Sequence, residues 1–201
     1  LDKTLRDLKK QFATFGKPKP IWTTEVGWRA KSGPGEETQA ARIVQTYVIH
    51  IANGIQNMAY FCMDDYDDWG FVKKEKPLET KLAYGAITRL TKALGSPGPC
   101  AAFQGYLRMP EGVACYVFRK PGNDRVLILW SNDETKRRVA LGQTKGLKGS
   151  DIIGRPVTIT MGTLTVGSTP VIIIGADARK IGKVSLDYNP YLLKRGQNVL
   201  I

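Results

Sequence analysis

The 201-residue sequence predicts an α/β barrel fragment followed by an all-β sandwich domain. In the first hundred residues, two strand-like runs flank a helix-like segment, and both runs end in polar or acidic residues. This order, with polar groups at the carboxyl ends of the strands, is typical of a parallel α/β barrel. Beyond Cys100, short β-type runs alternate with turn signals, which is typical of a sandwich.

The first predicted elements are a helix and a strand that carries a carboxylate. Apolar residues recur on one helical face over residues 1–16. Two prolines then precede the run Ile21–Trp28, and proline is tolerated at the start of a strand but not in its middle. We expect this run to form a short central strand whose carboxyl end delivers Glu25 to a cleft. The apolar face consists of Leu1, Leu5, Leu8, Phe12 and Phe15.

Glu25 is the candidate catalytic residue. Gly27 allows the backbone to turn away after it, and Trp28 offers an apolar face beside the carboxylate. One carboxylate that attacks or stabilises an oxocarbenium-like centre, next to aromatic side chains that stack on sugar rings, suits glycoside hydrolysis. From these residues alone, a strand followed by a solvated loop glutamate explains the pattern equally well.

The following segments support the barrel interpretation. Residues 36–53 show the three- and four-residue spacing of a helix that ends at Asn53-Gly54. The run Ile55–Met63 is predicted to be a second buried strand, and it leads into an acidic segment, 64–70. A further helix is expected over Pro77–Leu94, closed by Gly95.

These segments resemble the last two strand–helix units of a clan A glycoside hydrolase. In those (β/α)8, or TIM-barrel, enzymes the seventh strand ends in a Thr-Glu-x-Gly-type motif that bears the catalytic nucleophile. The stretch Thr24–Trp28 matches that motif position by position. The resemblance covers roughly residues 1–95, and it implies that Glu25 is the nucleophile of a retaining hydrolase.

The resemblance also implies a sugar subsite on the eighth strand. That strand corresponds to Met58–Asp65. Cys62 stands where relatives often carry a polar or acidic residue, so we expect no substrate contact from it. Because it lies inside a predicted strand, we expect Cys62 to be a small buried hydrophobe. The candidates for sugar stacking and hydroxyl bonding are Trp28, Tyr60, Asp64, Asp65 and Trp69.

The second carboxyl group of a retaining mechanism has no match in this sequence. Relatives place the acid/base after an Asn-Glu pair, and no such pair occurs here. A complete barrel also needs about 250 residues. We therefore expect residues 1–97 to be the carboxyl-terminal part of a barrel, and we expect the missing amino-terminal barrel segment to be a partner of this chain. The alternative is a non-catalytic fragment that acts as a carbohydrate-binding or structural module.

The acidic segment between Asp64 and Asp68 allows three interpretations. It could supply a general acid, because adjacent strands lie about 4.8 Å apart, or it could hydrogen-bond sugar hydroxyls, or it could be a solvated loop. It lacks the spacing of a calcium-binding loop. We therefore expect no metal site and no cofactor.

The composition changes at the breaker cluster Ser96–Pro99, which marks a predicted domain boundary. Residues 98–175 are expected to form the β-sandwich, with Trp130 and Tyr116 in its core rather than on a sugar-binding face. The tail, 176–201, matches no element of that domain. The expected strands are 103–109, 113–119, 125–131, 136–141, 157–160, 163–166 and 171–174.

Charge and composition restrict the partners. The net charge of +12 is scattered, and no nucleic-acid-binding motif appears, so we expect an oligo- or polysaccharide substrate, with anionic glycans as one option, and no specific nucleic acid. No apolar run of membrane-spanning length occurs, and His50 is expected to be structural. The family resemblance alone favours a secreted or cell-envelope location.

Overall fold

The computed structural model describes residues 1–17, 19–30, 35–64, 66–122, 124–142, 146–175, 181 and 184–186. Its helices are α1 (Asp2–Ala13), α2 (Glu36–Ala52) and α3 (Leu82–Leu94). The strands are β1 (Trp22–Val26), β2 (Asn57–Tyr60), β3 (Val72–Lys73), β4 (Lys76–Thr80), β5 (Ala102–Leu107), β6 (Val113–Arg119), β7 (Arg125–Ser131), β8 (Arg137–Ala140), β9 (Lys148–Asp151), β10 (Pro156–Val157), β11 (Thr163–Val166), β12 (Val171–Ile174) and β13 (Val184–Ser185).

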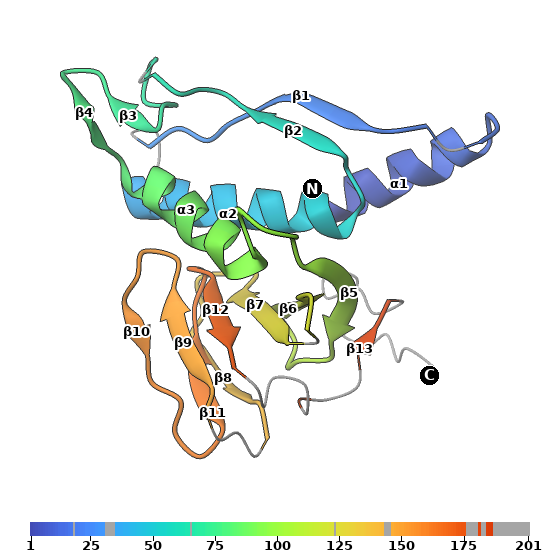
Figure 1. The fold of residues 1–201 in the computed structure, drawn as a ribbon, viewed down its shortest axis with the longest axis vertical. Helices are drawn as coiled ribbons and strands as arrows, with labels where there is room; N and C mark the ends of the chain where they lie inside the picture. Colours follow the sequence, from blue (N-terminus) through green and yellow to red (C-terminus); the bar gives the residue numbers. More distant parts are fainter. Residues whose placement is uncertain are drawn as a thin grey trace.

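The elements are arranged in layers around α2 and α3 (Figure 1). The parallel pair β1–β2 lies on one side of α2. On the other side lies a seven-stranded sheet in the order β10-β9-β12-β7-β6-β5-β13, and the β8–β11 ladder packs against the far face of that sheet. Within the described part of the chain, no helix is long and apolar enough to cross a bilayer.

Two apolar cores hold these layers together. The first joins the buried faces of α2 and α3 to one face of the large sheet, with Trp130, Tyr116 and Phe118 among its largest members. Trp130 is 2% exposed and stacks on Tyr116 at a centroid distance of 4.9 Å, which confirms both as core residues. The second core lies between the opposite face of the sheet and β8–β11.

The second domain was expected to be a β-sandwich, and that description is not established. One layer is the large sheet, but the layer facing it is a ladder of two strands. Lys148–Asp151 forms strand β9 although its sequence lacks an apolar run, because its backbone pairs between β10 and β12. Most of the predicted tail, 176–201, lies outside the described residues, but within it Val184–Ser185 pairs with β5.

The two strands that the sequence assigns to a barrel, β1 and β2, are shorter and less buried than predicted. β2 covers only Asn57–Tyr60 of the expected run, because the backbone turns away after Phe61 and Met63 instead accepts hydrogen bonds from Phe71 and Val72. Neither strand is buried, and Trp22 is 63% exposed. In the described structure α2 lies on one side of β1–β2, and no element is drawn over the other side (Figure 1).

The helix expected over Pro77–Leu94 begins at Leu82. Lys76–Thr80 forms β4, which pairs with β3, and the Lys81 amide donates to the Phe71 oxygen at 2.7 Å. These backbone bonds use groups that a longer helix would have required. The end of α3 is as predicted, because Gly95 adopts a left-handed conformation and Ser96 N bonds to Thr91 O.

Helix α1 covers most of the predicted segment, but its apolar face is only partly packed. Leu5 is buried against α2, whereas Phe12 and Phe15 are exposed. Helix α2 matches its predicted bounds within a residue. It ends at Ala52, Asn53 is its C-cap, and Gly54 follows with φ of 67°.

Candidate functional site

Glu25 lies on a β-bulge at the carboxyl end of β1. Thr23 pairs with Met58 and Val26 with Tyr60, so a step of three residues on β1 opposes a step of two on β2. A bulge redirects the side chains within it, and bulges are common next to active sites. Glu25 is exposed, and no residue among those described forms a hydrogen bond or an ion pair with its carboxylate.

Trp69 packs directly against the backbone that follows Glu25. A Cβ built on Gly27 would lie 2.8 Å from Trp69 Cε3 and 2.3 Å from the Phe61 oxygen, so only glycine fits there without displacing a neighbour. Phe61 contacts both Trp69 and Tyr66 edge-on, each at a centroid distance of 6.2 Å. We call Phe61, Tyr66 and Trp69, which lie in the connection between β2 and β3, the loop aromatics; Tyr66 is 69% exposed.

Two cations hold the acidic loop that carries these rings. Arg29 forms an ion pair with Asp67, and its guanidinium lies 6.0 Å from the Trp69 ring centroid. The buried Lys81 ammonium lies 3.8 Å from an Asp68 carboxylate oxygen. Asp67 and Asp68 are therefore engaged within the protein, and no group of three metal-ligating side chains occurs among the described residues.

Beneath the loop, Gln39 on α2 forms a buried hydrogen-bond centre. Its side-chain Nε2 donates to the backbone oxygens of Trp28, Asp68 and Trp69 at 2.7, 3.1 and 3.1 Å. It also lies 3.4 Å from the Tyr60 hydroxyl. Gln39 thus joins the segment after β1 to the segment after β2.

Tyr60 and Trp28 belong to this inner layer. The Tyr60 hydroxyl donates to Trp69 O at 2.6 Å, its ring stacks on Phe71 at 4.1 Å, and burial raises its pKa to about 12. The Trp28 indole donates from Nε1 to Thr46 Oγ1 at 3.0 Å, and Arg42 lies over the ring. Both side chains therefore contact residues of α2, namely Thr46 and Gln39.

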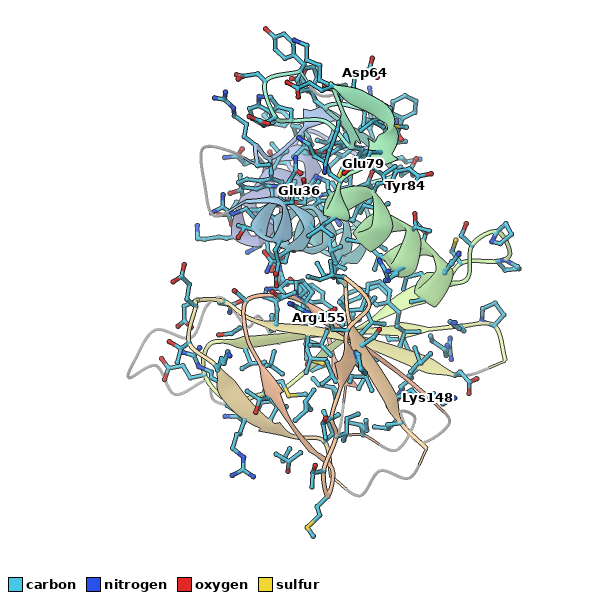
Figure 2. All side chains as sticks on the ribbon, turned by 90° about the vertical axis from the view of Figure 1, so that its left-hand side faces the viewer. Glu36, Asp64, Glu79, Tyr84, Lys148 and Arg155 are labelled. Carbon is cyan, nitrogen blue, oxygen red and sulfur yellow. The ribbon has the colours of Figure 1, made fainter. Side chains whose placement is uncertain are left out.

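The structure therefore divides the residues that the sequence singled out. It brings Trp69 next to the Glu25–Gly27 backbone, and it directs Trp28 and Tyr60 toward the helix layer. Asp64 is exposed at one end of the molecule (Figure 2), and Asp65 lies outside the described residues. Cys62, expected to be buried, is only half-buried because it follows the end of β2.

Sequence reasoning missed the roles of Gln39, Phe61 and Tyr66. A detectable signal for Gln39 was its place on the same helical face as Ala40 and Ile43, which the periodicity assigns to the core. His50, on the same helix, is buried, with Nδ1 2.7 Å from Thr46 O and Nε2 3.0 Å from Thr23 Oγ1. It fastens β1 to α2 two residues before Glu25.

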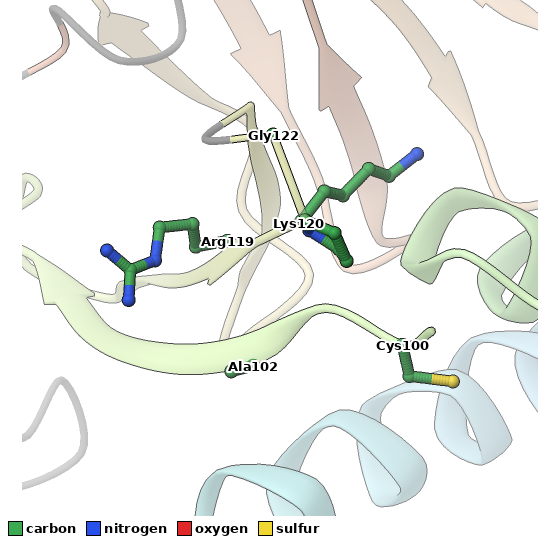
Figure 3. Close-up of a pocket in the computed structure, with 6 residues that line it drawn as sticks. Cys100, Ala102, Arg119, Lys120 and Gly122 are labelled. Carbon is green, nitrogen blue, oxygen red and sulfur yellow. The ribbon is translucent and has the colours of Figure 1, made fainter. Parts of the chain in front are cut away.

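Two cavities in the described structure lie away from Glu25. One, of about 530 Å³, runs between α2 and the β7–β8 connection and includes Trp28, Arg42 and Asn132. The other, of about 490 Å³, is shown in Figure 3, where the side chains of Arg119 and Lys120 point in different directions. Glu25 lines neither of these two cavities.

Comparison with known proteins places the fold. No protein-family model matches the sequence, and no curated protein matches it. Among solved structures, a family 39 glycoside hydrolase from Bacteroides cellulosilyticus WH2 has a TM-score of 0.66 at 18% identity, over 87% of this chain and 37% of that one. The catalytic domain of GH30 xylanase C from Talaromyces cellulolyticus has a TM-score of 0.55 at 13% identity, over 80% and 42%.

An α-amylase from Lactobacillus plantarum also matches, with a TM-score of 0.50 at 16% identity, over 87% of this chain and 42% of that one. The chain thus spans well under half the length of each of these structures. At such identities the likeness establishes architecture alone. The protein has a glycoside-hydrolase-like fold that corresponds to part of such an enzyme.

Proposed function

We propose that this chain is part of a clan A retaining glycoside hydrolase in which Glu25 is the nucleophile. The observation that carries the proposal is the bulge at Thr24–Glu25, which exposes the carboxylate two residues before the glycine on which Trp69 packs. A free carboxylate beside an aromatic ring is the pair of groups that attacks and holds a pyranose. The fold likeness to glycoside hydrolases supports the same conclusion.

In this mechanism a Glu25 carboxylate oxygen attacks the anomeric carbon and forms a covalent glycosyl-enzyme. An acid/base residue in a segment outside this sequence protonates the leaving oxygen and then activates the water that releases the sugar. Trp69 and the exposed Tyr66 offer ring faces to the sugar, and Asp64 and Asp65 are candidates for bonding its hydroxyls. Trp28 and Tyr60 have a structural role: Trp28 bonds to Thr46 of α2, and Tyr60 bonds to the backbone of Trp69.

The proposal includes a partner for the open face of β1–β2. Trp22 and Glu25 are exposed on a parallel pair whose outer strand edges are unpaired in the described structure. We propose that further barrel strands cover this face and complete the cleft, and that the substrate is an oligo- or polysaccharide. A secreted or cell-envelope location follows from the family resemblance.

The test is covalent trapping in the protein that carries the remaining barrel strands. A panel of 2-deoxy-2-fluoro-β-glycosyl fluorides (gluco, xylo, galacto and manno) should inactivate it, and mass spectrometry of a peptide digest should locate the added sugar on Glu25. Glu25→Gln should abolish labelling and turnover of the matching aryl glycoside. Glu75→Gln is the matched control, because Glu75 is an exposed glutamate in the β3–β4 turn. A label on another residue, or full activity in Glu25→Gln, would overturn the assignment.

The alternative is a non-catalytic module that binds carbohydrate. The open setting of Glu25 and the exposed ring of Tyr66 favour it, since both permit binding without an enclosed cleft. The same variant separates the two functions. A module would bind xylohexaose or cellohexaose with the same affinity before and after the Glu25→Gln substitution, and no fluoroglycoside would label it.

A further inference from the structure

Among the described residues, Gln39 forms hydrogen bonds with the candidate site through three backbone oxygens and the Tyr60 hydroxyl. It is 1% exposed and sits in the first turns of α2. The three carbonyl oxygens around its Nε2 can only accept hydrogen bonds, so the amino group must face them. Its Oε1 is buried without a donor among the described residues. The side chain therefore leaves one polar atom unsatisfied while its amino group faces four oxygens.

Those oxygens belong to the two segments that form the site. Trp28 O follows Glu25 and Gly27 at the end of β1, whereas Asp68 O and Trp69 O belong to the loop after β2. The fourth oxygen, the Tyr60 hydroxyl, itself donates to Trp69 O. Gln39 and Tyr60 thus converge on the backbone of the residue whose indole packs on Gly27.

Helix α2 is well suited to position these segments. It runs alongside β1 and β2 (Figure 1), and Thr46 and His50 connect it to Trp28 and Thr23 through further side-chain hydrogen bonds. A site supported from a packed helix is held more accurately than one supported from a loop. A shift in the Gln39 amide would therefore move the Trp69 ring relative to the Glu25 backbone.

We propose that Gln39 is a positioning residue that fixes Trp69 beside Glu25, and that it thereby determines how tightly the site holds the sugar ring next to the scissile bond. The second clause rests on the proposed glycosidase function, and the first does not. Because Trp69 would contact the sugar in the ground state and in the transition state alike, loss of its position raises KM and leaves kcat nearly unchanged.

The direct test is fluorine NMR of protein labelled with 5-fluorotryptophan, with the Trp69 resonance assigned by Trp69→Phe. Gln39→Met keeps the length of the side chain and removes the amide, so the Trp69 resonance should shift and broaden. Gln45→Met is the matched control, because the same substitution on the same helix removes a hydrogen bond to Ser168 O, which lies between β11 and β12. It should leave the Trp69 resonance unchanged.

A second variant adds a signature that loss of stability would not produce. In Gln39→Glu an ionised carboxylate would face the same oxygens and displace Trp69. Burial among acceptor oxygens raises the pKa of this carboxyl, so the titration starts at about pH 9. On acidification the protonated carboxyl regains one donor, so the Trp69 resonance should return toward its original position. If Gln39→Met fails to fold, the pH dependence of the Trp69 resonance in Gln39→Glu still tests whether residue 39 positions Trp69.

Kinetics then separate this proposal from the proposed function. On the aryl glycoside whose turnover Glu25→Gln abolishes, Gln39→Met should lower kcat/KM by about tenfold through KM. If no aryl glycoside is turned over, the glycosidase proposal fails, whereas a shifted Trp69 resonance still establishes the positioning role. A Trp69 resonance that is identical in Gln39→Met, Gln39→Glu and Gln45→Met would overturn the inference about Gln39.

Discussion

Trp69 and Gly27 are in such close contact that a single methyl group on the glycine would lie 2.8 Å from the indole Cε3. The same methyl group would lie 2.3 Å from the Phe61 oxygen, which belongs to the backbone. The contact brings the loop aromatics against the end of β1. It connects an exposed carboxylate with an aromatic ring from a distant part of the sequence.

Gly27→Ala should therefore destabilise the protein and displace Trp69. The new Cβ forces the Phe61 backbone and the indole apart, and overpacking of this kind costs about 1–3 kcal/mol. Urea unfolding measures the loss, and the Trp69 fluorine resonance reports the displacement. Gly167→Ala serves as the control, since its Cβ would meet nothing closer than Lys136 Cγ at 3.8 Å. Equal stabilities of the two variants would contradict the close contact.

His50 should make stability depend on pH. Because Thr46 O only accepts, Nδ1 carries the proton, and Nε2 accepts from the Thr23 hydroxyl, which requires a neutral ring. Burial lowers the pKa of His50 below the ordinary 6.5. Below pH 6.5 the unfolded chain binds the proton first, so stability falls as the pH falls toward the folded pKa, by at most about 1.4 kcal/mol per pH unit.

The measurement is urea unfolding between pH 8 and pH 5, compared with His50→Gln. Glutamine can form hydrogen bonds but does not titrate, and the sequence contains no other histidine. The difference in unfolding free energy between the two proteins should therefore change with pH in this range. A constant difference would show that the ring is not neutral and buried in the folded state.

The three thiols should react at different rates. Cys100 is exposed, Cys62 is half-buried, and Cys115 is fully buried in the second core, where burial raises its pKa to about 12. The thiolate is the reactive form. A native titration with Ellman's reagent should modify Cys100 first and Cys62 more slowly, and Cys115 only after denaturation, with peptide mapping to identify each site. Early modification of Cys115 would be incompatible with this packing.

Trp130 should be essential for the junction between α2 and the large sheet. It stacks on Tyr116 in the core shared by the helices and the sheet, so Trp130→Ala leaves a large cavity and should cost about 3–5 kcal/mol. Chemical denaturation measures this loss. Trp22→Ala is the control for removal of an indole, because Trp22 is mostly exposed, and it should change the stability of this chain far less. Similar losses in both variants would contradict the layered core.

Local patterns gave correct predictions where one segment controls its own conformation. The periodicity of residues 36–53 predicted α2, and Gly95 predicted the end of α3, because left-handed backbone angles favour glycine. The β runs 113–119 and 125–131 match β6 and β7 residue for residue. The predicted start of α3 was wrong because residues 76–80 form β4, which pairs with β3. Pairing between two segments cannot be read from the helical periodicity of one of them.

The site shows the same division. The sequence by itself determined that Glu25 stands near the end of a strand, before a glycine and among aromatic residues. Only the tertiary structure decided which aromatic accompanies it, since Trp28 turns toward Thr46 while the distant Trp69 packs on Gly27. It also created the bulge and the Gln39 centre. The physical reason is that side-chain direction depends on the register between strands and on buried hydrogen bonds between separate segments, which form only when the layers pack.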